Sequence, residues 1–192
     1  MDEKMRAWMA GWKRTVQWTD WNGDGLETLS IAHNDEDVLA EGIVSGHFEA
    51  GKYDLNYRLT IDPQWRVRDV RVQIVNGPRL HILSDGRGRW VSEDGAELSD
   101  LAGCLDVDIA ATPFTNTLPI RRLGQKTGVA EKISVAYVSL PNLIVEPVQQ
   151  RYTKLAGNRF LYEGLSTGFA AELEVDGDSI VLDYPGVYRR LS

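Results

Sequence analysis

The feature that most constrains the fold is a strict two-residue alternation of apolar and polar side chains. In residues 51–62 every second side chain is apolar, namely Tyr53, Leu55, Tyr57, Leu59 and Ile61. Successive side chains of a β-strand point to opposite faces, so this pattern predicts a strand with one buried face. Residues 168–176 repeat the pattern. Between residues 64 and 75 the parity of the apolar positions changes, which predicts a β-bulge near Arg68–Asp69.

Turn signals separate the alternating segments, among them Asn76-Gly77-Pro78, Asp85-Gly86 and Asp94-Gly95. We count roughly ten short strands at hairpin spacing, with no helices of crossover length between them. The sequence therefore predicts a mainly β protein, built as a single curved antiparallel sheet or half-barrel of roughly ten strands. Residues 115–128 have helical character, and we expect this short helix to cover the concave face and leave an apolar cavity beneath it.

The chain of 192 residues contains no linker-like segment, which favours one domain over residues 15–192. Residues 1–14 differ from the rest, because their large apolar side chains recur at helical spacing. We expect an N-terminal amphipathic extension that packs on the domain or contacts a partner through Met5, Trp8, Met9 and Trp12.

Charge and motif content exclude several classes of function. The chain has 28 acidic and 21 basic residues, a net charge of −7, which argues against nonspecific nucleic-acid binding. Its single cysteine, Cys104, excludes an internal disulfide, and no zinc-binding or nucleotide-cofactor motif is present. No apolar run is long enough to span a bilayer. We expect a cytoplasmic protein without a metal or cofactor.

Residues 105–122, LDVDIAATPFTNTLPIRR, form the best candidate site. The first part reads as a strand with Asp106 and Asp108 on one face. Two carboxylates on one face can act as general acid and base or hold a metal ion. They can equally face water or pair with arginines, which is the commoner arrangement on ordinary strands.

The second part of this segment resembles a helix start. Thr112, Thr115 and Asn116 surround the large ring of Phe114. Their side chains can satisfy the free backbone N–H groups of the first helical turn, or face a ligand oxygen there.

Arg121 and Arg122 follow about one turn later. They can make bidentate contacts to a phosphate, a sulfate or a sugar acid. The alternative is a salt bridge to Asp106 or Asp108.

Three segments resemble a known bacterial family: GCLDVDIAATPFTNTLPIRRLG, VEPVQQRYTKL and VDGDSIVLDYPGVYRR. The resemblance is to the family labelled putative glycolipid-binding and runs from about Val16 to the C-terminus. It implies a curved antiparallel sheet with helical cover, similar to the half-barrels of periplasmic lipoprotein carriers, and a role in binding a lipid or glycolipid. The candidate ligand-binding positions are Asp106, Asp108, Thr112, Phe114, Thr115, Asn116, Arg121, Arg122, Gln150 and Tyr152.

Three hypotheses about function follow. The favoured one is noncatalytic binding of an amphipathic small molecule, a lipid or glycolipid, between sheet and helix. The second is a small-molecule hydrolase or isomerase that uses Asp106 or Asp108 as acid and base. The third is a protein–protein interaction module that uses a strand edge or the face of Trp8 and Trp12.

Overall fold

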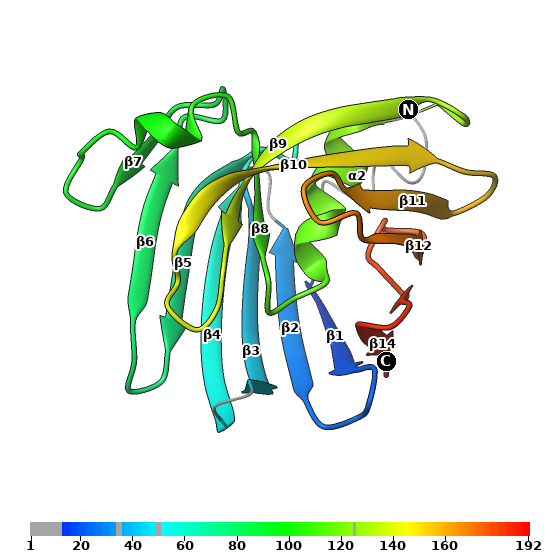
Figure 1. Cartoon of the computed structure of the whole chain (residues 1–192), viewed down its shortest axis with the longest axis horizontal. Coiled ribbons are helices and arrows are strands. Elements are labelled where there is room, and N and C mark those ends of the chain that lie inside the picture. Colours follow the sequence, from blue (N-terminus) through cyan, green and yellow to red (C-terminus); the bar gives the residue numbers. More distant parts are fainter. Residues whose placement is uncertain (1–12, 34–35, 49–50, 125) are drawn as a thin grey trace.

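The computed structural model describes residues 13–33, 36–48, 51–124 and 126–192. The expected amphipathic stripe at residues 5–12 lies outside these ranges. The described part is mainly β, as the sequence predicts (Figure 1). Its elements are β1 (Lys13–Asp20), β2 (Leu26–His33), β3 (Val38–Phe48), β4 (Gly51–Ile61), β5 (Val67–Ile74), β6 (Arg79–Ser84), β7 (Trp90–Ser92), η1 (Ser99–Leu101), β8 (Asp106–Ile109), η2 (Phe114–Asn116), α2 (Thr117–Leu123), β9 (Ala130–Val138), β10 (Val145–Lys154), β11 (Arg159–Gly164), β12 (Ala170–Glu174), β13 (Asp183–Tyr184) and β14 (Tyr188–Arg190).

The strands form two sheets, whereas the sequence predicts one sheet of roughly ten strands. Sheet A has nine strands in the order β13-β14-β1-β2-β3-β4-β5-β6-β7, and sheet B has five in the order β12-β11-β10-β9-β8. Within sheet B, β8 and β9 run parallel. Sheet B curls as a half-barrel and crosses sheet A with its strands at a steep angle (Figure 1). Alternation reveals which face of a strand is buried but not which strands are neighbours, so it did not reveal the division.

Strand β4 and the following bulge confirm the alternation pattern. The side chains of Leu55, Tyr57, Leu59 and Ile61 are buried, and the polar residues between them are exposed or half-buried. The register between β4 and β5 shifts at Thr60/Ile61, so that Arg68 is the extra residue of the pair. This is the predicted bulge.

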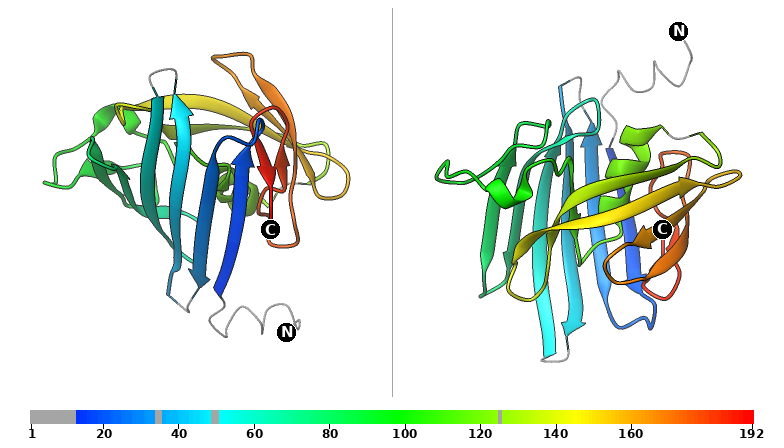
Figure 2. Two further views of the ribbon diagram at one scale, coloured as in Figure 1. Left: turned by 90° about the horizontal axis from the view of Figure 1, so that it is seen from below. Right: turned by 45° about the horizontal axis from the view of Figure 1, so that its top comes forward.

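The predicted helix is shorter than residues 115–128, because η2 and α2 together end at Leu123. Gly124 follows with φ +52°, a left-handed conformation that stops a helix. Figure 2 shows α2 between the two sheets. Leu118 and Phe114 pack in the cluster that contains the core of sheet A, and Ile120 packs with residues of sheet B. These buried side chains fill the space in which the sequence predicts an apolar cavity.

Gly42 provides a test of the inner face of sheet A. It lies opposite Tyr57 in the β3–β4 register, and a Cβ atom there would be 2.1 Å from Tyr57 Cε1. The Tyr57 ring is buried and its hydroxyl is hydrogen bonded, so it cannot move aside freely. We expect Gly42→Ala to lower the free energy of unfolding by about 2 kcal/mol or more in urea denaturation. Gly177→Ala is the control, because its Cβ would have no atom within 4 Å; equal effects of the two changes would contradict the prediction.

Candidate functional site

Most of the residues singled out in the sequence meet in one buried polar cluster between β8, η2, α2 and β10. Asp108 accepts hydrogen bonds from Thr115 Oγ1 (3.0 Å) and Gln150 Nε2 (2.6 Å). Asn116 Oδ1 accepts one from the Tyr152 hydroxyl (2.8 Å). These contacts connect sheet B to the helix that it covers.

Asp106 is fully buried and paired with Arg122. Nε and Nη2 of the guanidinium donate to the two carboxylate oxygens at 3.1 and 2.5 Å. Burial raises the pKa of Asp106, and the hydrogen bonds and charge of Arg122 oppose this. The pair confirms the salt-bridge alternative for Arg122 and leaves Asp106 with a structural partner.

The remaining candidates lie elsewhere. Phe114 is part of the apolar core. Thr112 Oγ1 accepts a hydrogen bond from the Phe114 N–H (3.0 Å), as expected for a residue that stabilises the start of a helical turn. Arg121 points away from the cluster, since its guanidinium stacks 4.1 Å from the Trp65 ring centroid and donates to the Asp178 carbonyl.

The sequence reasoning missed Glu27, which lies buried at the inner face of β2 and has an exposed fraction of only 2%. Its Oε1 accepts hydrogen bonds from the Tyr57 hydroxyl (2.5 Å) and from Thr112 Oγ1 (2.6 Å). Its Oε2 is buried and has no hydrogen-bond partner within the described residues. A signal was available, because Glu27 is in phase with the buried Leu29 and Ile31 of the same strand.

Burial dominates the protonation of Glu27. It raises the pKa of this carboxyl from 4.5 to about 8, and the hydrogen bonds from Thr112 and Tyr57 lower it only in part. At neutral pH the group is therefore mostly a neutral acid. Because both protein donors bind Oε1, Oε2 is the oxygen that remains for the proton and for a ligand.

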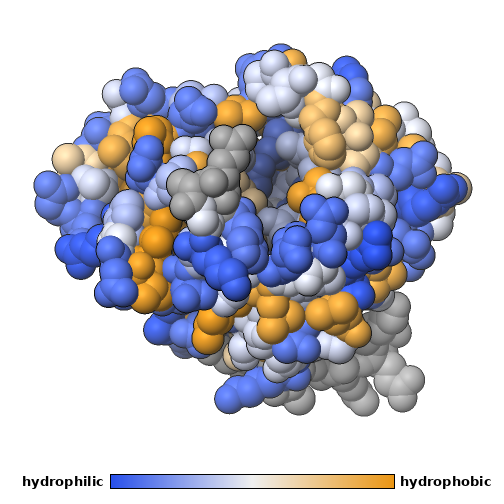
Figure 3. Space-filling view, turned by 60° about the horizontal axis from the view of Figure 1, so that its bottom comes forward, coloured by the Kyte–Doolittle hydropathy of each residue, from blue (hydrophilic) through white to orange (hydrophobic). Residues whose placement is uncertain are grey.

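Glu27 lines a pocket of about 350 Å³. The pocket opens near the β1–β2 and β3–β4 turns, on the lower side of Figure 1, and Figure 3 shows that this side is hollowed. Its walls combine aromatic and aliphatic side chains with a few polar groups: Trp18, Leu26, Tyr53, Tyr137, Leu140, Val187 and Tyr188, together with Asp20, Ser45, His47 and Ser139. Such a mixture is typical of small-molecule sites.

Two kinds of feature are absent from the described residues. They contain no group of three or more His, Cys, Asp or Glu side chains that could hold a metal ion. None of their helices has the length and apolar character needed to cross a membrane.

The Asp106–Arg122 pair predicts a stability effect. Arg122→Gln leaves a buried carboxylate without its counter-charge, so we expect the free energy of unfolding to fall by about 3 kcal/mol. The double change Asp106→Asn/Arg122→Gln removes both charges and should recover much of this loss. Arg159→Gln is the matched control, because the Arg159–Glu172 pair is half exposed and should contribute less than about 1 kcal/mol. Urea denaturation of all four proteins measures these differences; a double variant as unstable as Arg122→Gln would contradict the explanation.

The raised pKa of Glu27 predicts that its contribution to the stability of the fold decreases as the pH rises. Its folded-state pKa of about 8 exceeds the value of 4.5 expected in the unfolded chain, so its contribution to stability is complete below pH 4.5 and is lost as the pH rises through 8. Glu27→Gln should remove the part of this pH dependence that comes from Glu27, and it should be more stable than the wild type at the alkaline end, by about 5 kcal/mol at most. Asp106 and Asp108 are present in both proteins and act in the same direction. Equal slopes in the two proteins would show that Glu27 does not titrate in this window.

Comparisons with known proteins agree with this architecture. The chain is similar to a crystal structure of a DUF1089 family protein from Pseudomonas aeruginosa, with 40% sequence identity, a TM-score of 0.79, and coverage of 88% of this chain and 92% of that one. No curated protein matches at a significant level. A family model described as putative glycolipid-binding matches residues 15–190. The chain therefore belongs to this putative glycolipid-binding family.

Proposed function

We propose that the protein binds, without catalysis, an amphipathic molecule of the glycolipid class, and that the neutral polar head of this molecule enters the Glu27 pocket. The observation that carries the proposal concerns Glu27, which lines a pocket and whose buried Oε2 has no hydrogen-bond partner within the described residues. A buried polar atom without a partner is costly, and a ligand hydroxyl would satisfy it. The description of the family supports the same class of ligand.

The charges of the pocket favour a sugar over a phosphate head. Asp20 and Glu27 line it, and the described lining residues include neither lysine nor arginine. An anion would therefore meet the Asp20 carboxylate without a lysine or arginine as counter-charge. A neutral polyol can instead accept from the Glu27 acid and exchange hydrogen bonds with the tyrosine hydroxyls of the walls, while its apolar face lies against their rings.

Apolar side chains of the pocket offer a surface on which the lipid chain of the ligand can lie. Leu26 is 44% exposed, and Leu140 and Val187 line the same pocket. A lipid chain that leaves the pocket here covers apolar side chains that water now contacts.

Thr112 positions Glu27 in this site, because its hydroxyl donates a hydrogen bond to Glu27 Oε1. The other candidate residues from the sequence do not line the Glu27 pocket. Of the two carboxylates considered for acid–base chemistry, Asp106 is paired with Arg122, and Asp108 accepts hydrogen bonds from Thr115 and Gln150. This arrangement favours binding over the hydrolase or isomerase alternative.

The test is a binding measurement with chemically defined lipids. We expect native mass spectrometry and calorimetry to detect a complex with a neutral short-chain glycolipid, such as an alkyl glucoside, and weaker binding of a phosphatidylglycerol of equal chain length. Glu27→Ala should weaken the glycolipid complex by about tenfold, because one charge-free hydrogen bond and the shape of the pocket are lost.

Glu131→Ala is the matched control, because Glu131 lies exposed on β9. Wild-type affinity should also fall as the pH rises above about 8, where ionised Glu27 can no longer donate. Absence of any glycolipid complex, or equal affinity of the wild type and Glu27→Ala, would overturn the proposal.

A further inference from the structure

The Glu27 pocket is lined by a second carboxyl group, that of Asp20 at the end of β1. Asp20 is in phase with the buried Trp18, so its side chain lies on the inner face of sheet A. Glu27 is the cross-strand partner of Trp18, which makes Asp20 and Glu27 diagonal neighbours on this face. Diagonal neighbours in a sheet are about 7–8 Å apart. The head of one small molecule can therefore contact both carboxyl groups.

The two oxygens of Asp20 differ in their surroundings. Oδ1 accepts hydrogen bonds from the backbone N–H groups of the β1–β2 turn, those of Asn22 (3.1 Å), Gly23 (2.7 Å) and Asp24 (2.9 Å). Within the described residues, every hydrogen bond to the Asp20 side chain goes to Oδ1. The turn thus holds the carboxylate in place and leaves the two lone pairs of Oδ2 for other donors.

Gly25 leaves space beside this oxygen. It lines the same pocket, and a Cβ atom there would be 3.0 Å from Asp20 Oδ2 and 3.1 Å from the Ser45 carbonyl oxygen. Its φ lies outside the left-handed region, so the backbone conformation alone does not require glycine. A side chain at this position would press on Oδ2 and cover it. Glycine keeps the oxygen within reach of a molecule in the pocket.

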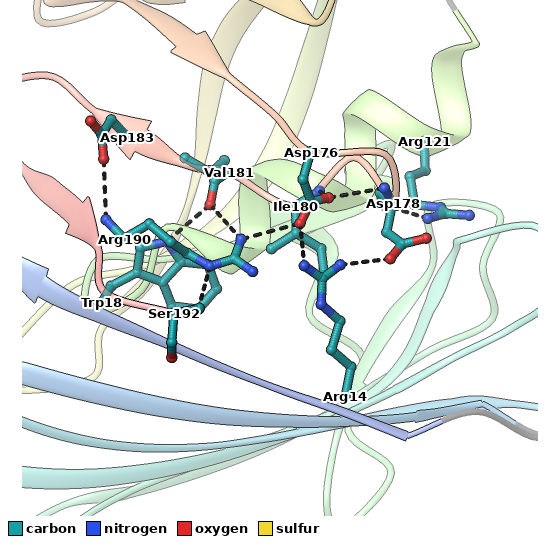
Figure 4. A network of polar contacts seen from close by, with 10 residues as sticks. All are labelled: Arg14, Trp18, Arg121, Asp176, Asp178, Ile180, Val181, Asp183, Arg190 and Ser192. Atoms are coloured by element: carbon teal, nitrogen blue, oxygen red, sulfur yellow. Dashed lines mark hydrogen bonds and ion pairs between the residues drawn. The ribbon is translucent and has the colours of Figure 1, made fainter.

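The part of β1 that carries Asp20 is held by contacts outside the pocket. Trp18 Nε1 donates to the Val181 carbonyl (3.0 Å), and the guanidinium carbon of Arg190 lies 5.4 Å from the centroid of the Trp18 ring (Figure 4). Arg190 is itself paired with Asp176 (3.2 Å), as Figure 4 shows. A wall that is fixed before the ligand arrives lowers the entropic cost of binding.

Asp20 and Glu27 offer complementary hydrogen-bonding groups. The Asp20 carboxylate only accepts hydrogen bonds, whereas the Glu27 acid can donate one, because burial raises its pKa to about 8. An ammonium group would satisfy Asp20 but has no acceptor for Glu27. Hydroxyl groups both donate and accept, and two neighbouring hydroxyls can donate to the two lone pairs of Asp20 Oδ2. A head group with adjacent hydroxyls therefore matches both side chains.

We propose that Asp20 determines which head groups the Glu27 pocket accepts, and that its Oδ2 receives two neighbouring hydroxyl groups, so that the ligand carries an unsubstituted vicinal diol. This inference rests on the proposed function, which places a neutral polar head in the same pocket. Hydrogen bonds to a charged acceptor are roughly twice as strong as those between neutral groups. Loss of one of the two hydroxyls from the ligand therefore has a large effect on affinity.

Two ligands that differ by a single hydroxyl group test the diol. 1-O-Octylglycerol carries a vicinal diol, and 3-octyloxypropan-1-ol has the same chain with only one hydroxyl. We expect calorimetric titration of the full chain, below the micelle concentration, to give an affinity for the diol on the order of tenfold higher. Octylamine, which offers an ammonium group on the same chain, should bind more weakly than octylglycerol.

Asp20→Asn tests the oxygen itself. The Asn oxygen can still accept the N–H groups of the turn, whereas its NH₂ group replaces the acceptor Oδ2 by a donor. We expect affinity for octylglycerol to fall on the order of tenfold, and the preference over the single hydroxyl to disappear. Gly25→Ala keeps Asp20 and covers Oδ2, so it should cause a loss in the same direction.

Asp24→Asn is the matched control, because it removes an equal charge from the same turn at an exposed position outside the pocket lining. It should bind octylglycerol as the wild type does, and urea denaturation checks that all variants are folded. Equal affinities of the wild type for the diol and the single hydroxyl, equal losses in Asp20→Asn and Asp24→Asn, or tighter binding of octylamine would overturn the inference.

The same titrations separate this inference from the proposed function. If the wild type binds neither octylglycerol nor octyl glucoside, the proposed function is wrong and the role of Asp20 is wrong with it. If Glu27→Ala weakens binding and Asp20→Asn does not, the proposed function holds and only the role of Asp20 is wrong.

Discussion

The structure depends on burying one polar segment between two sheets. Residues 111–120 are buried throughout, although Thr112, Thr115 and Asn116 among them carry polar side chains, each of which is hydrogen bonded. Groups of this kind are tolerated in an interior only when partners are held in place around them. Sheet A supplies Glu27 and Tyr57 on one side, and sheet B supplies Asp108, Gln150 and Tyr152 on the other. The hydrogen bonds that result determine how the two sheets are placed relative to α2.

The same requirement explains the unusual state of Glu27. A carboxyl group that serves as acceptor for both Tyr57 and Thr112 must remain where water cannot reach it. Its neutral form then becomes the stable one, its second oxygen is left without a hydrogen-bond partner among the described residues, and Glu27 lines a pocket. In the proposed function, this structural acceptor of the core also donates a hydrogen bond to the ligand. Stability and the proposed binding thus rest on one side chain.

Charge is distributed unevenly over two pockets. The Glu27 pocket is lined by carboxyl groups and tyrosines, whereas a second pocket at the end of α2 is lined by Arg121 and Lys154, which lie on the Trp65 and Phe160 rings. Arg121 and Arg122 are adjacent in the sequence, yet one belongs to an open pocket and the other neutralises Asp106 in the interior. Because neighbouring residues of a helix point about 100° apart, adjacent arginines reach different environments.

The sequence by itself determined the local structure: the alternation in β4, the bulge at Arg68 and the strand at Asp106–Ile109 are all readable from the period of side chains and the turn residues. It also identified the segment whose polar residues meet in the core. Only the tertiary structure decided that the strands divide into two sheets, that Arg122 rather than Arg121 pairs with Asp106, and that Glu27 lies beneath Thr112, 85 residues away in the chain. The physical reason is that alternation and propensity act between near neighbours, whereas strand pairing, burial and protonation depend on which distant segments exclude water together.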